Sequence, residues 1–300
     1  MPTRYDVWFT DDARSFLDRA GEHLAADPVT GTVVATNAQR LAADAARGEE
    51  PRTPYSWFAV VSGPDGDVVG VAMRCAPFPP YPPYLLAMPD EAAAALADAL
   101  LDRGEEVGGA NGLRPAADVL AARIADRTGR ATSVVMHTRL FELGTLVEPR
   151  PVPGRLRPVL EEEAELALRW IHRFFLDADE QAGREPGSGH SPEDFTIDDV
   201  HRRIAEDALW FWVDAGDRPV HLTGANPPAF GVTRVGPVFT PVEERGRGWA
   251  SAAVAAVSRA YLRQGVRVTL FTDQANPTSN ALYTALGYRP VVDTVDVRLH

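Results

Sequence analysis

The order of strands and helices predicted for residues 151–300 occurs a second time, more loosely, in residues 1–150. Apolar spacing and capping residues in the later half predict a strand, two helices, three strands, a helix, a strand, a helix and a final strand. The earlier half shows a similar succession. Because a single core rarely grows far past the 300 residues of this chain, the pattern favours a tandem repeat of one α/β (α+β) fold.

A proline-rich stretch, Val147–Gly154, separates the two halves. Proline removes a backbone donor and disfavours helix in the residue before it, so this stretch is a natural connection between domains. We therefore predict one domain at 1–150 and another at 151–300. In the second, the predicted strands are Leu156–Leu160, Leu209–Asp214, Val220–Thr223, Gly231–Thr240, Val266–Thr272 and Tyr288–Leu299, and the predicted helices are Glu161–Leu176, one ending near Glu206, Trp249–Arg263 and Ser279–Leu286.

The first domain gives a less regular pattern of the same kind. Its segment Gly109–Gly112, before the last predicted helix, is similar to Gln274–Pro277 in the second domain, which supports the repeat. The predicted strands are Trp57–Val61, Val68–Arg74, Tyr84–Ala87, a weak one around Val107 and Ser133–Leu143, and the predicted helices are Ala13–Leu24, Asn37–Ala46, Glu91–Leu101 and Ala116–Ile124.

Composition excludes several classes of function. A formal charge of −12 argues against nucleic-acid binding, which needs a basic face. No run approaches the roughly 18 to 20 apolar residues of a membrane span, and no apolar leader follows Met1, so we expect a cytoplasmic protein without a membrane partner. The single cysteine, Cys75, excludes an intramolecular disulfide, and the histidines show no metal-ligand spacing, so we predict no metal site.

The most informative segment runs from Val238 to Ser251 and leads into the long predicted helix. Its glycines, Gly246 and Gly248, let successive backbone N–H groups turn into one concavity, to which the first N–H groups of the helix add. The helix dipole places partial positive charge at the same point, and Arg245 and Arg247 flank the turn. Such a structure is suited to hold a pyrophosphate.

Two motifs in this half resemble signatures of the GNAT superfamily of N-acetyltransferases. Arg245-x-x-Gly248-x-Ala250 after a strand resembles the acetyl-CoA motif of that family. Asn276, followed by Tyr283 seven residues later and then by Gly287-Tyr288, resembles its second signature. The resemblance covers about 156–300, whereas the first half matches only in the order of its elements. It implies two tandem GNAT-like domains with mixed, mostly antiparallel sheets flanked by helices, the first of them degenerate.

The resemblance also implies roles for individual residues. Acetyl-CoA would be the co-substrate, and Tyr283 would lie near its thioester sulfur. The backbone of the fourth strand would pair with the pantetheine arm where that strand separates from the fifth, Asn276 would hydrogen-bond the same arm, and the glycine turn would hold the pyrophosphate. The residues assigned to cofactor binding are Val238, Phe239, Thr240, Arg245, Gly246, Arg247, Gly248, Trp249, Ala250, Ser251, Asn276 and Asn280.

The chemistry of acetyl transfer supports a role for Tyr283. An amine attacks a thioester only when neutral, and a tyrosine with an ordinary pKa of about 10 stays protonated near pH 7 and can protonate the departing thiolate. The predicted fifth strand carries no glutamate to act as general base, and the nearest acid is Asp273. Asp273 acts either as a base through water or as a loop acid that fixes the turn at Asn276. The loop 177–194 and water are the other candidates for the base.

Simpler interpretations stand beside these assignments. Tyr283 can be a core residue beneath the last strand, and Asn276 a helix-entry residue. A dinucleotide-binding fold is disfavoured, because few residues remain after Asp273. The alternative function is a non-catalytic CoA-binding or regulatory module. For the enzyme, we expect a primary amine of a small molecule or a peptide N-terminus as the acceptor, with a homodimer left open.

Overall fold

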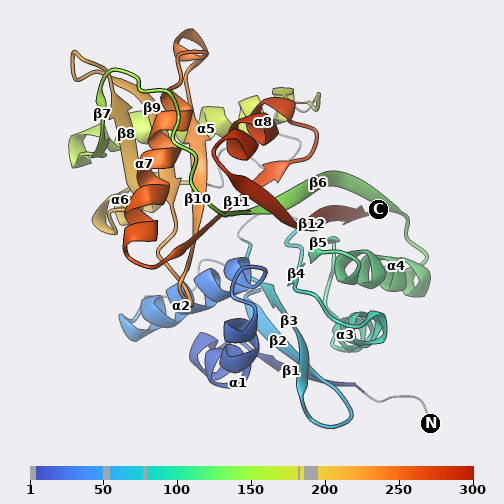
Figure 1. Cartoon of the computed structure of the whole chain (residues 1–300). Coiled ribbons are helices and arrows are strands. Elements are labelled where there is room, and N and C mark those ends of the chain that lie inside the picture. The colour runs from blue at the N-terminus through green and yellow to red at the C-terminus, as the bar shows by residue number, and fades with distance from the viewer. Residues whose placement is uncertain (1–4, 50–54, 77–79, 182, 186–194) are drawn as a thin grey trace. The chain divides into compact units, whose positions relative to one another are not determined.

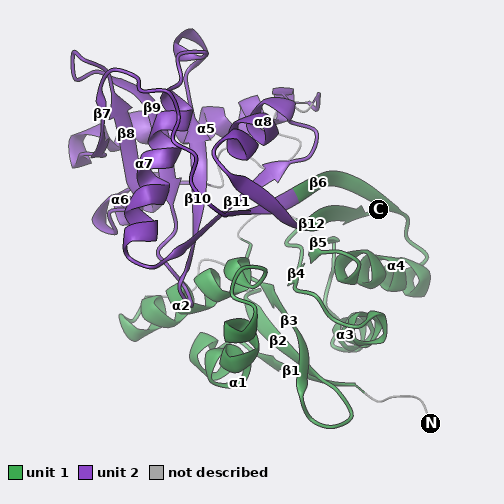
Figure 2. Cartoon of the chain, in the orientation of Figure 1, with its two compact units in different colours: residues 1–138, 292–300 green, residues 139–291 purple. Residues whose placement is uncertain are grey.

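The computed structural model describes residues 5–49, 55–76, 80–181, 183–185 and 195–300. The chain divides into two compact units (Figure 2). Unit 1 comprises residues 1–138 and 292–300, and unit 2 comprises residues 139–291. In the described residues, no helix has the length and apolar character needed to cross a membrane.

The first repeat of the chain contains six strands and four helices, of which the last strand, β6, continues from unit 1 into unit 2. Its first strand was not predicted, and the rest follow the predicted order (Figure 1). The elements are β1 Asp6–Thr10, α1 Ala13–Ala26, α2 Thr32–Ala46, β2 Trp57–Ser62, β3 Val68–Arg74, β4 Tyr84–Leu85, α3 Asp90–Asp102, β5 Gly109–Leu113, α4 Ala116–Thr128 and β6 Thr132–Leu143.

Unit 2 has the same succession of strands and helices, with two short 3₁₀ turns added. The long helix α7 has the bounds predicted for it, whereas α5 extends five residues beyond the predicted Leu176. The elements are β7 Arg155–Pro158, η1 Glu161–Glu163, α5 Ala164–Gln181, α6 Ile197–Ala205, β8 Leu209–Val213, β9 Pro219–Ala225, β10 Val232–Phe239, η3 Val242–Glu244, α7 Trp249–Arg263, β11 Arg267–Asp273, α8 Pro277–Ala285 and β12 Tyr288–Leu299.

The two halves of the chain therefore share one element order, β-α-α-β-β-β-α-β-α-β, and the prediction of two tandem α/β domains with mostly antiparallel sheets is confirmed. The weak strand predicted around Val107 corresponds to β5 at Gly109–Leu113. Within it, Gly112 has a φ of 132° and lies against the backbone of Leu85. The close backbone approach explains why the pairing of β4 with β5 needs a glycine at this point.

The sixth strand of each sheet comes from the other repeat. In unit 1 the order is β1-β2-β3-β4-β5-β12-β6, and residues Thr294–Arg298 of β12 pair antiparallel with β5. In unit 2, the last residues of β6 lie next to β11, and the order continues through β10, β9 and β8 to β7. The division of the chain thus falls inside β6 and inside β12, whereas the sequence suggested a single boundary at residue 150.

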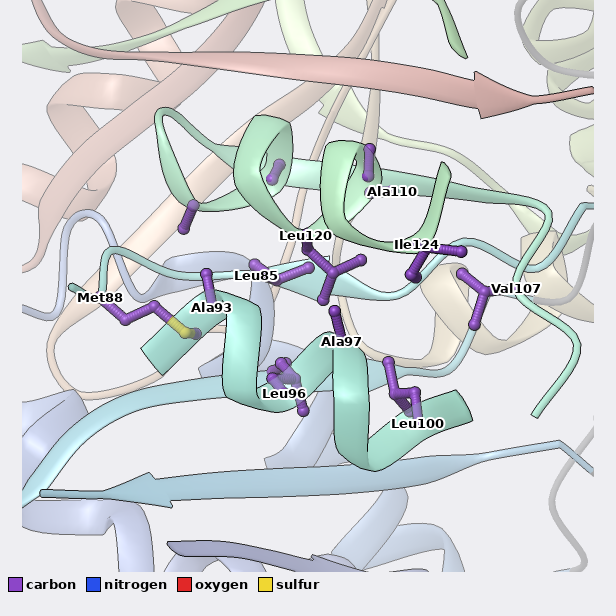
Figure 3. Packing of buried hydrophobic residues seen from close by; sticks show 14 of the residues in the cluster. Leu85, Met88, Ala93, Leu96, Ala97, Leu100, Val107, Ala110, Leu120 and Ile124 are labelled. Atoms are coloured by element: carbon purple, nitrogen blue, oxygen red, sulfur yellow. The ribbon is translucent and has the colours of Figure 1, made fainter. Parts of the chain in front are cut away.

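The core of unit 1 lies between its sheet and the helices α3 and α4 (Figure 3). Alanine and leucine alternate along the facing sides of the two helices, so the helices approach each other and the sheet closely. The labelled residues of this cluster are Leu85, Met88, Ala93, Leu96, Ala97, Leu100, Val107, Ala110, Leu120 and Ile124.

The sheet of unit 2 is covered on both faces. Because side chains alternate along a strand, Phe211 packs among residues of α5 and α6, while Trp212 packs with Trp249 at the start of α7. The neighbouring Trp210 lies edge-on to Tyr261 of α7. The three consecutive aromatic residues of β8 therefore pack into both layers of the core, and two of them contact α7.

Candidate functional site

Strands β10 and β11 pair over only part of their length. Their parallel register runs from Val232–Arg267 to Arg234–Thr269 and then ends. On its other side β10 pairs with β9, with a register shift between Val235 and Val238 at the Gly236-Pro237 step. Among the described residues, the later part of β10 therefore has a strand partner on the β9 side alone. A diverging strand of this kind presents backbone groups to a ligand that can pair with it.

The glycine turn follows the diverging strand. Gly246 and Gly248 have φ values of 75° and 86°, which glycine adopts readily and other residues rarely do. Gly248 is the N-cap of α7 and supplies no side chain to cap the helix. Within the described part of the chain, no group accepts a hydrogen bond from the N–H groups of residues 246–251. These amides form a set of donors at the positive end of the α7 dipole.

The two arginines of the turn are engaged by protein groups. Arg245 donates from Nε to the carbonyl oxygen of Thr240 at 3.1 Å and from a terminal nitrogen to Asp177. Arg247 lies 2.9 Å from a carboxylate oxygen of Glu244. Both arginines were predicted to belong to the cofactor site, and in the structure each contacts a carboxylate.

The two adjacent residues Val238 and Phe239, before the turn, lie on opposite faces of the sheet. Val238 belongs to the hydrophobic cluster that contains Tyr283, whereas Phe239 packs in the cluster below α5. Trp249 is buried at the first position of α7, and Ala250 and Ser251 are partly exposed beside it. A Cβ atom on Gly248 would lie 3.0 Å from a methyl group of Val152, so the turn is closely packed on that side.

The second predicted motif forms the entry to α8. Asn276 caps this helix by accepting a hydrogen bond from the N–H of Ser279 at 3.1 Å, with Pro277 at its first turn. Asn280 donates to the carbonyl oxygen of Asn276 at 2.8 Å and accepts from Thr272. Both asparagine side chains are thus employed within the turn, as the helix-entry interpretation of Asn276 expected.

Comparisons with known proteins agree with this geometry. The family model described as FR47-like protein matches residues 229–297, the range that holds the diverging strand, the glycine turn and the α8 entry. No curated protein matches the sequence.

Solved structures match the whole length of the chain. A GCN5-related N-acetyltransferase from Sphaerobacter thermophilus has a TM-score of 0.57 at 18% identity, with 100% of this chain and 96% of that chain covered. An acetyltransferase from the GNAT family of Colwellia psychrerythraea has a TM-score of 0.59 at 12% identity, with 99% and 98% covered. A tandem GNAT protein from the clavulanic acid biosynthesis pathway has a TM-score of 0.56 at 16% identity, with 99% and 98% covered.

The chain has the GNAT fold. The resemblance seen in the motifs is thereby confirmed at the level of the fold.

Tyr283 of this GNAT fold lies in the core beneath the last strand. It is 7% exposed, and its ring meets that of Tyr288 edge-on with a centroid distance of 5.9 Å. Burial raises the pKa of Tyr283 well above the ordinary value of tyrosine, so the hydroxyl stays protonated at neutral pH. No described residue forms a hydrogen bond with this hydroxyl. Burial fits the core interpretation, and a protonated hydroxyl without a protein partner fits a proton donor.

Tyr288, in contrast, has a complete set of partners. Its hydroxyl lies 2.7 Å from Ser258 Oγ, and Ser258 donates its own proton to the carbonyl oxygen of Val254. Tyr288 is therefore the donor to Ser258, and burial raises the pKa of Tyr288 as well. The two tyrosines thus differ: the hydroxyl of Tyr288 is bonded to Ser258, and no described residue bonds the hydroxyl of Tyr283.

Asp273 ends β11 and holds the turn that follows. Its carboxylate accepts from the N–H of Ala275 at 2.8 Å and forms an ion pair with Arg184 at 2.6 Å. Arg184 also pairs with the buried Asp179 at 3.0 Å. These contacts favour the role of a loop acid over that of a general base.

The C-terminal turn of α5 connects the glycine turn with the α8 entry, and sequence reasoning did not identify it. Asp177 holds Arg245, and Gln181 accepts from the side-chain amide of Asn276 at 2.8 Å. Asp177 was assigned to a loop that was considered as a source of the base; it lies in the helix, and residues 182 and 186–194 of that loop lie outside the described residues. Acidic residues at the C-terminus of a helix oppose its dipole, and this mismatch was the available signal that Asp177 has partners elsewhere.

A buried histidine supports the end of β10. His221 lies between two hydroxyl groups, with Nδ1 2.7 Å from Thr240 Oγ1 and Nε2 2.7 Å from Thr223 Oγ1. Complete burial lowers the pKa of His221 to about 3, so the ring is neutral at pH 7. A neutral imidazole donates one hydrogen bond and accepts one, which matches the two hydroxyls. No cluster of three or more potential metal ligands occurs in the described ranges.

Proposed function

We propose that unit 2 binds acetyl-CoA and transfers the acetyl group to a primary amine, as an N-acetyltransferase. The observation that carries the proposal is the set of N–H donors in residues 246–251, which follows a strand that has separated from its neighbour. Backbone donors at a helix N-terminus suit a diphosphate, and an unpaired strand edge suits the amide-containing pantetheine arm. CoA combines both chemical groups in one molecule.

The names of similar structures support an acyltransferase. The structures from Sphaerobacter thermophilus and Colwellia psychrerythraea are described as acetyltransferases. Their identity to this chain is 18% and 12%, so the acetyl donor and the amine acceptor come to this chain as a proposal.

The residues of the site fit this ligand in a definite way. The backbone of Val238 to Thr240 would pair with the pantetheine arm, and the amides of residues 246–251 would hold the diphosphate. The first turn of α7 contains no acidic residue, so nothing there opposes an anion. The side chains of Asn276 and Asn280 already form hydrogen bonds within the turn before α8. These two residues would therefore support the pantetheine arm by fixing the shape of that turn.

The reaction needs a neutral amine and a stable leaving group. Bound CoA would supply the thioester, and a main-chain N–H of β10 would polarise its carbonyl group. Tyr283 would protonate the sulfur as it leaves, for which its raised pKa keeps the proton in place at pH 7. Holding the two reactants together would contribute up to roughly 7–11 kcal/mol. Because Asp273 is tied to Arg184, we assign deprotonation of the ammonium group to water.

Titration calorimetry with acetyl-CoA, followed by an assay of thiol release with a panel of amines, tests the proposal. The panel should include amino acids, polyamines, aminoglycosides and peptides with free N-termini. Saturable binding and amine-dependent thiol release are expected. A chain that binds no CoA at millimolar concentration would rule out the assigned site.

The alternative is a CoA-binding module without catalysis. It is favoured by one observation, that the only acid at the end of β11 in the described structure is occupied by an arginine. Tight CoA binding together with inactivity toward every amine of the panel would select this alternative.

A further inference from the structure

We propose that Arg245 and Arg247 are positioning residues, each held by a buried carboxylate, so that the diphosphate is gripped by backbone amides alone. This inference rests on the proposed binding of CoA and specifies how the same site works. It assigns a function to Asp177 and Glu244, two acidic residues placed close to a site for an anion.

Arg245 connects three parts of unit 2. Its Nε atom bonds the carbonyl oxygen of Thr240 at the end of β10, and its terminal nitrogen bonds Asp177 on α5. The side chain of Asp177 is 5% exposed and also pairs with Arg173, one helical turn before it. The guanidinium group therefore closes the backbone loop from 240 to 245 and fastens this loop to a helix.

Arg247 is held in a similar manner from the other side of the turn. Its side chain bonds the carbonyl oxygen of Glu243 at 3.2 Å and pairs with Glu244 at 2.9 Å. Glu244 is 7% exposed and receives a second arginine, Arg218 from the β8–β9 turn, at 2.8 Å. Each carboxylate thus has two cationic partners, which compensates for its removal from water.

The placement of these acids decides between two roles for the arginines. An arginine that grips phosphate directly would be weakened by a neighbouring carboxylate, and removing that carboxylate would free it for the ligand. An arginine that shapes the turn needs its carboxylate, and removing either partner would disorder the backbone donors to the same extent. The two roles therefore give opposite signs for the effect of Asp177→Asn on CoA affinity.

The test measures CoA affinity by calorimetry for Asp177→Asn, Arg245→Gln and the double variant. We expect each single variant to weaken binding about tenfold, because preorganised donors lose their geometry. The double variant should be no weaker than the poorer single variant, since both remove one shared interaction. The KM for acetyl-CoA should rise while kcat stays constant. The matched control is Arg259→Gln. Arg259 lies on α7 and forms an exposed ion pair with Glu148, and its variant should bind CoA as the wild type does.

Tighter binding by Asp177→Asn would overturn the proposal, as would additive losses in the double variant. Hydrogen exchange of the ligand-free protein separates this result from a failure of the proposed function. The amides of residues 244, 245 and 252 donate to the backbone carbonyl oxygens of residues 241, 242 and 248 around the turn. These amides should exchange faster in Asp177→Asn and Arg245→Gln than in the wild type and in Arg259→Gln, whether or not CoA binds. Unchanged exchange in both variants would contradict the positioning role.

Discussion

The helix that follows the fourth strand begins differently in the two units of this GNAT fold. In unit 2, residues 240–248 separate β10 from α7, and Gly246 and Gly248 have positive φ values of 75° and 86°. In unit 1, only residues 86–89 separate β4 from α3, and they contain no glycine. One fold thus contains two versions of the same junction.

The junction of unit 1 is filled by side chains. Met88 is buried and packs so closely on β3 that a Cβ atom at Gly70 would lie 2.5 Å from the Met88 Cβ atom. The first turn of α3 carries Asp90 and Glu91, which occupy the positive end of that helix dipole. The junction before α7 is therefore longer and carries two glycines, and the first turn of α7 lacks the acidic residues that the first turn of α3 carries.

The largest expected effect comes from making the α7 junction resemble that of α3. Gly248→Glu places a side chain where φ is 86° and where Val152 already lies 3.0 Å from a Cβ atom, and it adds a negative charge. We expect CoA affinity to fall by more than about 100-fold, which corresponds to about 2.7 kcal/mol. Calorimetry measures the loss, and the circular dichroism spectrum verifies folding. Wild-type affinity in a folded variant would show that the diphosphate lies elsewhere.

The second-largest effect is expected from Tyr283, which lies in unit 2 together with the glycine turn. Tyr283→Phe should lower kcat by about 100-fold through loss of the proton donor, with the Kd of CoA unchanged. Tyr288→Phe, which removes the hydroxyl bonded to Ser258, is the matched control and should lower stability by about 1 kcal/mol with little effect on kcat. Equal turnover by wild type and Tyr283→Phe would assign Tyr283 to the core.

Acid should destabilise unit 2 through His221. The unfolded chain binds a proton at the ordinary pKa of 6.5, whereas the folded chain binds it only near a pKa of about 3. The contribution of the neutral His221 ring to the free energy of unfolding is thus fully present above pH 6.5. It decreases by about 1.4 kcal/mol per pH unit as the pH falls toward 3. Denaturant unfolding between pH 4 and pH 6.5 should give a shallower pH dependence for His221→Gln than for the wild type. The same pH dependence of the unfolding free energy in His221→Gln and in the wild type would contradict this role of His221.

The smallest effect is expected from changing the charge of the α3 junction. Removing both acids with Asp90→Ala and Glu91→Ala should leave the stoichiometry at one CoA per chain and the affinity within about twofold, because Met88 still fills the space. Calorimetry of the double variant measures both quantities. Appearance of a second site would mean that charge alone distinguishes the two junctions.

The features that depend on neighbouring residues could be predicted from the sequence. The glycine turn and the bounds of α7 follow from local backbone preferences and from the spacing of alanines. The predicted site residues include both asparagines that shape the α8 entry. For Asn276, the role in capping that helix was one of two interpretations of the sequence.

The features that depend on distant pairing could not be predicted. Asp177 and Arg245 are 68 residues apart, and nothing in either local pattern indicates the partner. Strand β1 is five residues long and was missed because its stability comes from pairing with β2. The strand at Gly109–Leu113 contains two glycines and an asparagine, residues that are typical of turns. The glycine at position 112 is explained by the close approach of the Leu85 backbone, which comes from a different strand.

The exchange of sixth strands has a consequence for biosynthesis and for dissection of the protein. Strand β5 pairs with Thr294–Arg298, which follow it by more than 180 residues in the sequence, so the N-terminal sheet is completed only after the second repeat has been synthesised. A fragment that ends at residue 150 lacks this partner and exposes the hydrogen-bonding edge of β5 to other chains. We therefore expect such fragments to aggregate during expression. We also expect the first unit to complete its folding only after the second repeat has been synthesised, and not as an independent domain.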